Sequence, residues 1–101
     1  MTIENTSGSQ KYPALATNGN TVHIIWTDNR SQPGKLYYKQ SADLGFTWTE
    51  GISISALNDA LIDAKRNTAI ACVGNFVYVI YGTTINPTEN HYAVRFVRST
   101  D

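Results

Sequence analysis

The feature that most constrains the fold of this chain is an internal repeat of about fifty-five residues. The segment ALATNGNTVHIIW (14–26) aligns with AIACVGNFVYVIY (69–81) at a constant offset of 55 residues. The alignment resumes after a three-residue shift, with LYYKQSAD (36–43) against VRFVRSTD (94–101). Repeats of this length are typical of architectures in which each unit buries its apolar face against the next unit.

Each unit is predicted to be β-structure. Asn-Gly-Asn at 18–20 and Gly-Asn at 74–75 lie between apolar runs, which is typical of β-hairpins. The runs VHIIW (22–26) and FVYVIY (76–81) alternate little, which indicates strands buried on both faces. Antiparallel strands usually leave one face in water, so we expect these sheets to be stacked between neighbours.

Residues 41–48 read SADLGFTW and fit the pattern S-x-D-x-G-x-T-W at every fixed position. This segment resembles the Asp box (BNR repeat) of sialidase-like β-propellers. A carboxylate at the start of a tight turn accepts hydrogen bonds from the backbone of that turn, and one carboxylate is too few for calcium. The resemblance therefore implies a structural role for Ser41, Asp43, Gly45, Thr47 and Trp48, and for Ser99 and Asp101 in the second copy.

The resemblance implies an all-β fold with two four-stranded antiparallel propeller blades per chain. Residues 1–11 are predicted to hold an N-terminal strand (2–5) and a loop, and 56–66 a second loop. Blade one covers 12–55, and blade two covers 67–101 without a fourth strand of its own. The predicted strands are 12–17, 21–27, 35–41 and 47–55, then 67–73, 76–81 and 91–99.

Two blades do not close a propeller ring, which needs roughly four to eight. An isolated chain would expose apolar blade faces and an unpaired strand edge. Charged residues make up 16% of the chain, against about a quarter in ordinary soluble proteins, which favours a partly covered surface. Because sialidase-like propellers usually have six blades, we predict a cyclic trimer in which Thr2–Asn5 completes the second blade of a neighbour. A tetramer with eight blades is the alternative.

A ligand is predicted on the face opposite the Asp boxes, where the loops 28–34, 83–90, 6–11 and 56–66 meet. The segment WTDNR (26–30) resembles a W-x-D-x-R pattern of this superfamily. Arginine binds carboxylates through two parallel hydrogen bonds, and aromatic rings stack on sugars. The candidate ligand-binding residues are Trp26, Asp28, Asn29, Arg30, Arg66 and Tyr81. The alternative, which we favour, is a structural ion pair between Asp28 and Arg30.

The predicted function is a non-catalytic propeller module that forms a ring and binds glycans. The alternatives are an exo-sialidase-like glycoside hydrolase and an engineered or minimal scaffold without a ligand. Identical blades do not place a nucleophile and an acid asymmetrically around one sugar, and a fold alone does not license an activity. We therefore rank the enzyme second.

The composition argues against several other classes of function. The net charge is zero and no basic run occurs, which argues against nucleic-acid binding. No apolar stretch approaches the roughly 18 residues of a membrane span, and no signal peptide is recognisable, although secretion of a parent protein stays open. No metal or cofactor is expected, because no Cys/His cluster has ligand spacing. Cys72 and His23 are predicted to be core residues.

Overall fold

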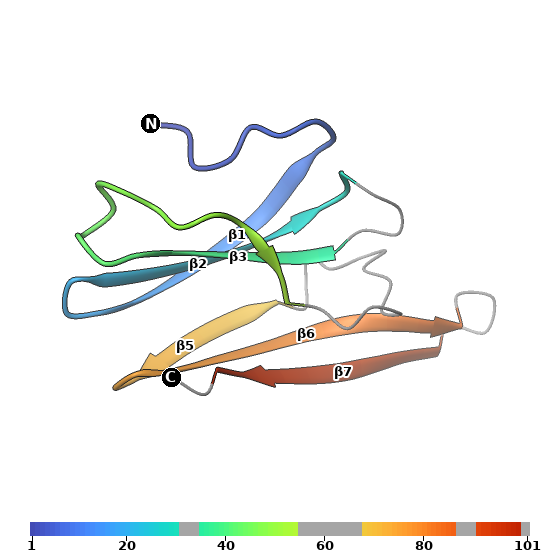
Figure 1. Ribbon diagram of the computed structural model, residues 1–101. Helices are drawn as coiled ribbons and strands as arrows, with labels where there is room; N and C mark the ends of the chain where they lie inside the picture. Colours follow the sequence, from blue (N-terminus) through green and yellow to red (C-terminus); the bar gives the residue numbers. More distant parts are fainter. Residues whose placement is uncertain (31–34, 55–67, 87–90, 100–101) are drawn as a thin grey trace.

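A computed structural model of the chain describes residues 1–30, 35–54, 68–86 and 91–99. These residues form two antiparallel β-sheets and no helix (Figure 1). The first sheet has the order β1-β2-β3-β4 and the second the order β5-β6-β7. The strands are β1 (Gln10–Asn18), β2 (Thr21–Asp28), β3 (Lys35–Ser41), β4 (Ile52–Ser53), β5 (Ala69–Val73), β6 (Phe76–Asn86) and β7 (His91–Arg98). The predicted all-β, antiparallel class is confirmed.

The pairing register of the first sheet is repeated in the second. Ala14 lies opposite Ile25 in the β1–β2 pair, and Ala69 lies opposite Ile80 in the β5–β6 pair, at the offset of 55 residues found in the sequence. The β2–β3 and β6–β7 registers also correspond once three additional residues between β6 and β7 are allowed for. The sequence repeat is therefore also a repeat of backbone pairing.

Side chains of each sheet alternate between an inner face, directed at the other sheet, and an outer face, directed away from it. The inner face of the first sheet carries His23, Ile25, Leu36 and Tyr38. Its outer face carries Leu15, Ile24, Trp26 and Tyr37. The inner face of the second sheet carries Ile70, Val77, Val79 and Tyr81. Its outer face carries Tyr78, Ile80, Val94 and Phe96.

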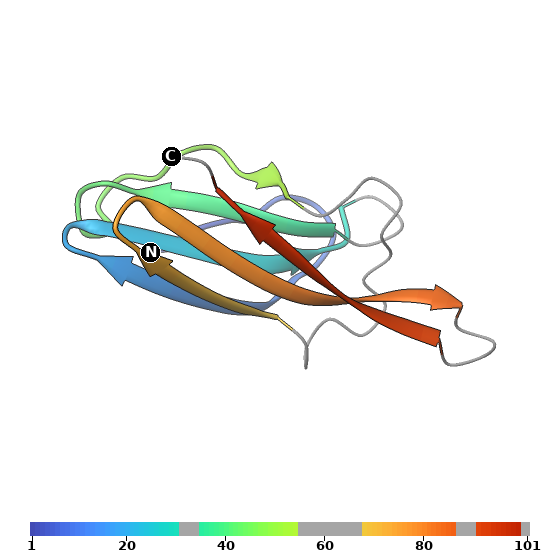
Figure 2. The ribbon, with the colours of Figure 1, turned by 90° about the horizontal axis from the view of Figure 1, so that it is seen from below.

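The two inner faces form one apolar core. Ile25 and Leu36 of the first sheet belong to the same buried cluster as Val77, Val79 and Tyr81 of the second. Figure 2 shows the second sheet lying across the first, with β5 beside β1. Burial of a large aliphatic side chain contributes roughly 1.5–3 kcal/mol, so this cluster is the main attachment between the sheets.

The N-terminal segment, residues 1–9, runs along the outer side of the first sheet (Figure 1). The Nζ of Lys39 in β3 donates a hydrogen bond to the carbonyl oxygen of Ile3 (2.6 Å) and pairs with the Glu4 carboxylate (2.9 Å). Within this chain, Thr2–Asn5 is not a strand. Its pairing with a neighbouring chain stays a prediction.

The predicted strands 47–55 and 76–81 differ most in length from the observed ones. The predicted fourth strand, 47–55, is reduced to Ile52–Ser53, because the N–H of Thr47 donates to Asp43 in the preceding turn. The predicted loop at 83–90 was wrong at its start, because β6 continues to Asn86. Residues 83–85 are Thr-Thr-Ile, and β-branched residues favour strands.

The first strand begins earlier than predicted and contains an irregularity. It starts at Gln10, and its register shifts between Lys11 and Ala14. Tyr12 has a φ of 58° there, which is characteristic of a locally distorted edge. The predicted loop 56–66 lies outside the described residues.

Candidate functional site

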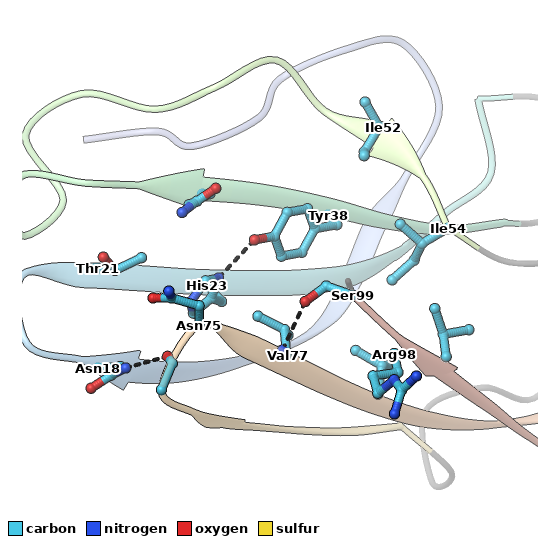
Figure 3. Close-up of a pocket in the computed structure, with 14 residues that line it drawn as sticks. Asn18, Thr21, His23, Tyr38, Ile52, Ile54, Asn75, Val77, Arg98 and Ser99 are labelled. Atoms are coloured by element: carbon cyan, nitrogen blue, oxygen red, sulfur yellow. Dashed lines mark hydrogen bonds between the residues drawn. The ribbon is translucent and has the colours of Figure 1, made fainter. Parts of the chain in front are cut away.

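A cleft of about 580 Å³ opens between the two sheets, near the β1–β2 and β5–β6 turns (Figure 3). Val77 and Val79 form part of its apolar wall, and polar side chains from both sheets reach it, among them His23, Tyr38 and Ser99. None of the described residues that line the cleft is Asp or Glu. Glycoside hydrolysis commonly uses a pair of carboxyl groups, so the described lining does not supply that chemistry.

His23 and Tyr38 form a polar side-chain contact inside this cleft. The Nδ1 atom of His23 lies 2.7 Å from the Tyr38 hydroxyl, and the two rings stack with centroids 5.9 Å apart. Burial lowers the pKa of His23, so its imidazole is neutral at pH 7. His23 is buried, which agrees with its predicted place in the core.

A second polar cluster lies at the end of β2, where the sequence predicts a ligand. Arg30 Nε donates to Asp28 Oδ1 (2.9 Å) and Arg30 Nη2 to Asp28 Oδ2 (2.7 Å), and the backbone N–H of Arg30 also donates to Oδ1 (2.8 Å). Trp26 Nε1 donates to Asp28 Oδ2 at 2.9 Å. The favoured alternative of a structural Asp28–Arg30 ion pair describes this arrangement.

The charges of this cluster are balanced within the chain. Burial raises the pKa of Asp28, but hydrogen bonds from Arg30 and Trp26 outweigh that effect and hold the pKa at about 2. The pKa of Arg30 is raised, chiefly by its hydrogen bonds to Asp28. The guanidinium also lies 3.5 Å from a Glu4 oxygen and 4.2 Å from the centre of the Tyr37 ring. Such an enclosed pair stiffens the loop more readily than it recruits an external carboxylate.

The other candidate ligand residues do not form one open site. Trp26 and Tyr81 are both buried, so neither ring offers a face to solvent in this chain. Asn29 is exposed, and its side-chain oxygen accepts a hydrogen bond from the N–H of Ser9. At Gly8, where φ is 86°, a Cβ atom would lie 2.8 Å from this Asn29 oxygen and 3.0 Å from the Cα atom of Arg30, so a larger residue is disfavoured there. Arg66 lies outside the described residues.

The turn at residues 41–48 is built from its own side chains. Ser41 Oγ donates to Asp43 Oδ1 (2.8 Å) and accepts the N–H of Gly45 (2.7 Å). Asp43 accepts the backbone N–H (2.8 Å) and the hydroxyl (2.6 Å) of Thr47. Trp48 Nε1 donates to the carbonyl of Gly45 (3.0 Å). All five fixed positions of the sequence pattern therefore take part in one hydrogen-bond network.

This network accounts for two local properties of the turn. Gly45 has a φ of 94°, a conformation that side chains disfavour. Hydrogen bonds from Thr47 and Ser41 lower the pKa of Asp43 to about 2. In the second copy, Ser99 Oγ accepts the N–H of Val77 at 2.9 Å, and Asp101 lies outside the described residues.

Glu4 is the residue of this region that sequence reasoning missed. It contacts Lys39 and Arg30, and hydrogen bonds from Thr6 and Lys39 lower its pKa against the opposing effect of burial. No motif or periodicity in the sequence connects Glu4 with β3. Only the path of the N-terminal segment over the first sheet brings these residues together.

No family model matches the chain, and no curated protein or solved structure matches it either. Within the described ranges, no group of three His, Cys, Asp or Glu side chains is placed to hold a metal ion. The same part of the chain contains no helix long and apolar enough to cross a membrane.

Proposed function

We propose that this chain is a non-catalytic β-propeller module that assembles with copies of itself into a closed ring. The main support is a difference in side-chain exposure between equivalent positions of the two sheets. Leu36 is 0% exposed between the sheets, whereas Val94, at the equivalent position of β7, is 79% exposed. Ile25 and Ile80 differ in the same way, at 0% and 46%. A repeat that buries this face once and leaves it open once is suited to receive a further blade.

Two further observations support blades of the sialidase-like type. Sheets with the same register that stack face to face are the arrangement that propeller blades adopt. The turn at 41–48 has a hydrogen bond at each of the five positions that the Asp-box pattern fixes. We therefore retain the Asp-box interpretation as part of the proposal, with Asp43 as a structural residue.

The ring size follows from the number of blades. Propellers contain roughly four to eight blades, and head-to-tail contacts close into a ring when the rotation per chain allows it. Six blades, the usual number in sialidase-like propellers, require three copies of a two-blade chain. A tetramer with eight blades is the alternative.

Neither glycan binding nor sialidase activity gains support from the described residues. The guanidinium of Arg30 is occupied by Asp28 and Glu4, and the described lining of the cleft contains no carboxyl group. Glycan binding at the Arg30 end remains a prediction from the sequence. The exo-sialidase remains the enzymatic alternative, and turnover of a fluorogenic sialoside would establish it.

The assembly proposal is tested by light scattering coupled to size-exclusion chromatography. We expect a stable species of three times the 11.2 kDa chain mass, without turnover of the sialoside. A mass that stays at that of one chain up to millimolar concentration would overturn the proposal.

A further inference from the structure

The outer face of the second sheet has an uncovered apolar surface. Ile80, Val94 and Phe96 are all exposed there, and Phe96 lies opposite Ile80 in the β6–β7 register. Tyr78, two residues before Ile80, stacks on Phe96 with ring centroids 6.1 Å apart at 25°. Contiguous apolar surfaces of this kind commonly mark sites of protein–protein contact.

This surface reproduces the inner face of the first sheet at the level of side-chain pairs. Tyr78 and Phe96 are the repeat counterparts of His23 and Tyr38, which also stack, with centroids 5.9 Å apart at 24°. The earlier pair faces the second sheet across the cleft, with His23 buried and Tyr38 partly buried. The later pair has no sheet over it among the described residues. The same surface is therefore present twice and covered once.

The complementary surface is also present twice. The inner face of the second sheet, which covers the first sheet, includes Ile70, Val79 and Tyr81. Their repeat counterparts on the outer face of the first sheet are Leu15, Ile24 and Trp26. Leu15 is exposed. Trp26 is buried, and the N-terminal segment lies on part of this face. The chain thus has a second copy of each of the two surfaces that it already packs together internally, exposed on the second sheet and partly covered on the first.

We propose that the outer face of the second sheet packs on the outer face of the first sheet of a second copy of this chain. A second copy of the chain is the expected partner, because the contact between the two sheets within one chain is formed by the repeat counterparts of the same side chains. This inference rests on the proposed function and specifies its interface. The contact is head-to-tail, because the two surfaces are different, so one chain offers both and can bind two neighbours.

The charges near this interface are compatible with burial. Lys39 on the outer face of the first sheet is paired with Glu4 (2.9 Å), and Arg30 with Asp28 (2.7 Å). Paired charges avoid the large cost of an uncompensated buried charge. Arg98 occupies the repeat position of Gln40, which borders the cleft, so the corresponding space between two chains would leave Arg98 hydrated.

The N-terminal segment is placed to take part in the same contact. Ile54, which follows β4, packs against the core cluster that the second sheet completes. Ile3 and Glu4 contact Lys39 on the outer face of the first sheet. They precede the first sheet in the chain as Ile54 precedes the second. In the proposed contact they lie beside β7 of the neighbour, whose outer edge has no strand next to it among the described residues.

The test uses one charge on each surface and then mixes the two variants. Val94→Glu places a carboxylate on the outer face of the second sheet, and Leu15→Glu places one on the outer face of the first. Both wild-type side chains are exposed, so each variant should keep the circular-dichroism spectrum of the parent. Phe46→Glu is the matched control, because Phe46 is an exposed apolar residue in the turn at 41–48, outside both surfaces.

We expect light scattering to give the mass of one chain for Val94→Glu and for Leu15→Glu, with association weakened about 100-fold or more by the buried charge. An equimolar mixture should give a species of two chains, because each variant keeps the surface that the other has lost. Phe46→Glu should assemble like the parent.

The outcomes separate this inference from the proposal on which it rests. If the parent assembles and either surface variant retains the parental mass, the interface is wrong while ring assembly stands. If Leu15→Glu alone forms a dimer, or if the mixed variants stay monomeric, the head-to-tail pairing is wrong. If the parent itself is monomeric up to millimolar concentration, both proposals fail.

Discussion

The two sheets of this protein have the same strand register but differ in what covers them. In the first sheet, β2 has buried residues on both faces, because the second sheet lies on one side and the N-terminal segment on the other. In the second sheet, Val77, Val79 and Tyr81 of β6 are buried and Ile80 is exposed. The central residues of both strands are mainly apolar. The difference shows that burial is set here by the neighbours of a strand and not by its own sequence.

The comparison also identifies which apolar surface is not covered within one chain. Where the first sheet has Leu36 in the core, the second sheet has Val94 in solvent. Contiguous exposed apolar surfaces commonly mark contacts with another protein chain, and the packing of the two sheets on each other favours self-association as that contact. Substitutions at equivalent positions of the two sheets test this comparison directly.

The largest effect on the free energy of unfolding is expected from truncation at two equivalent positions of the sheets, of which only the first lies in the core. Leu36→Ala should destabilise the chain by roughly 2–5 kcal/mol, because it leaves a cavity between the sheets. Val94→Ala at the equivalent position should cost about 0.5 kcal/mol or less in the monomer, because Val94 is exposed there. Urea unfolding of both variants at low chain concentration measures the difference. Equal costs would mean that the two positions are covered alike in the monomer.

A smaller effect is expected from the polar cluster that occurs only in the first sheet. Asp28→Asn should cost roughly 2 kcal/mol at pH 7, because it removes charge-assisted hydrogen bonds from Arg30. The repeat counterpart of Asp28 is Thr83, so no equivalent ion pair is expected in the second sheet.

The pH dependence of this variant provides an independent check. The folded-state pKa of Asp28, about 2, lies below its ordinary value of 3.8, so its contribution is present above about pH 4 and is lost as the pH falls towards 2. The stability difference between the parent and Asp28→Asn should shrink over this range in thermal unfolding. A constant difference from pH 7 to pH 2 would contradict the assignment of this carboxylate.

The smallest effect is expected at the His23 position, which Tyr78 occupies in the second copy. Burial lowers the pKa of His23 below 6.5, so the unfolded chain binds a proton more readily and stability falls as the pH drops below about 6.5. His23→Tyr introduces the residue type of the second copy, and the adjoining cleft leaves room for it. We expect the slope of Tm between pH 7 and pH 5 to decrease in this variant. An unchanged slope would place the titrating group elsewhere.

The sequence predicted the β class, the repeat and most strands, because apolar runs and Asn-Gly turns are local signals. β3, for example, has the predicted bounds of Lys35–Ser41. Local signals were insufficient at the fourth strand. There the Asp43 side chain accepts the backbone N–H and the hydroxyl of Thr47, so this N–H is not available for the pairing of a longer strand. They also gave no indication that Glu4 would lie against Lys39. Contacts of that kind depend on how a segment crosses a sheet and have no periodicity to reveal them.

The sequence is less informative about the candidate ligand site than about the fold, for the same reason. The W-x-D-x-R segment drew attention to Trp26, Asp28 and Arg30, but a pattern does not state whether Arg30 points to a partner or to solvent. In the structure Asp28 is buried under Trp26 and Arg30, and the three side chains satisfy one another. The sequence indicated that these residues interact, and the fold shows that their interaction is internal.

Hydrogen exchange of β3 and β7, followed by mass spectrometry at low and high chain concentration, tests the proposed assembly most directly. Among the described strands of one chain, β7 lies at the edge of its sheet, whereas β3 lies between β2 and β4. We expect amide exchange in residues 91–98 to slow markedly as the concentration rises, while exchange in residues 35–41 stays constant. Exchange in β7 that is independent of concentration, under conditions where light scattering reports an oligomer, would contradict the proposed use of this sheet.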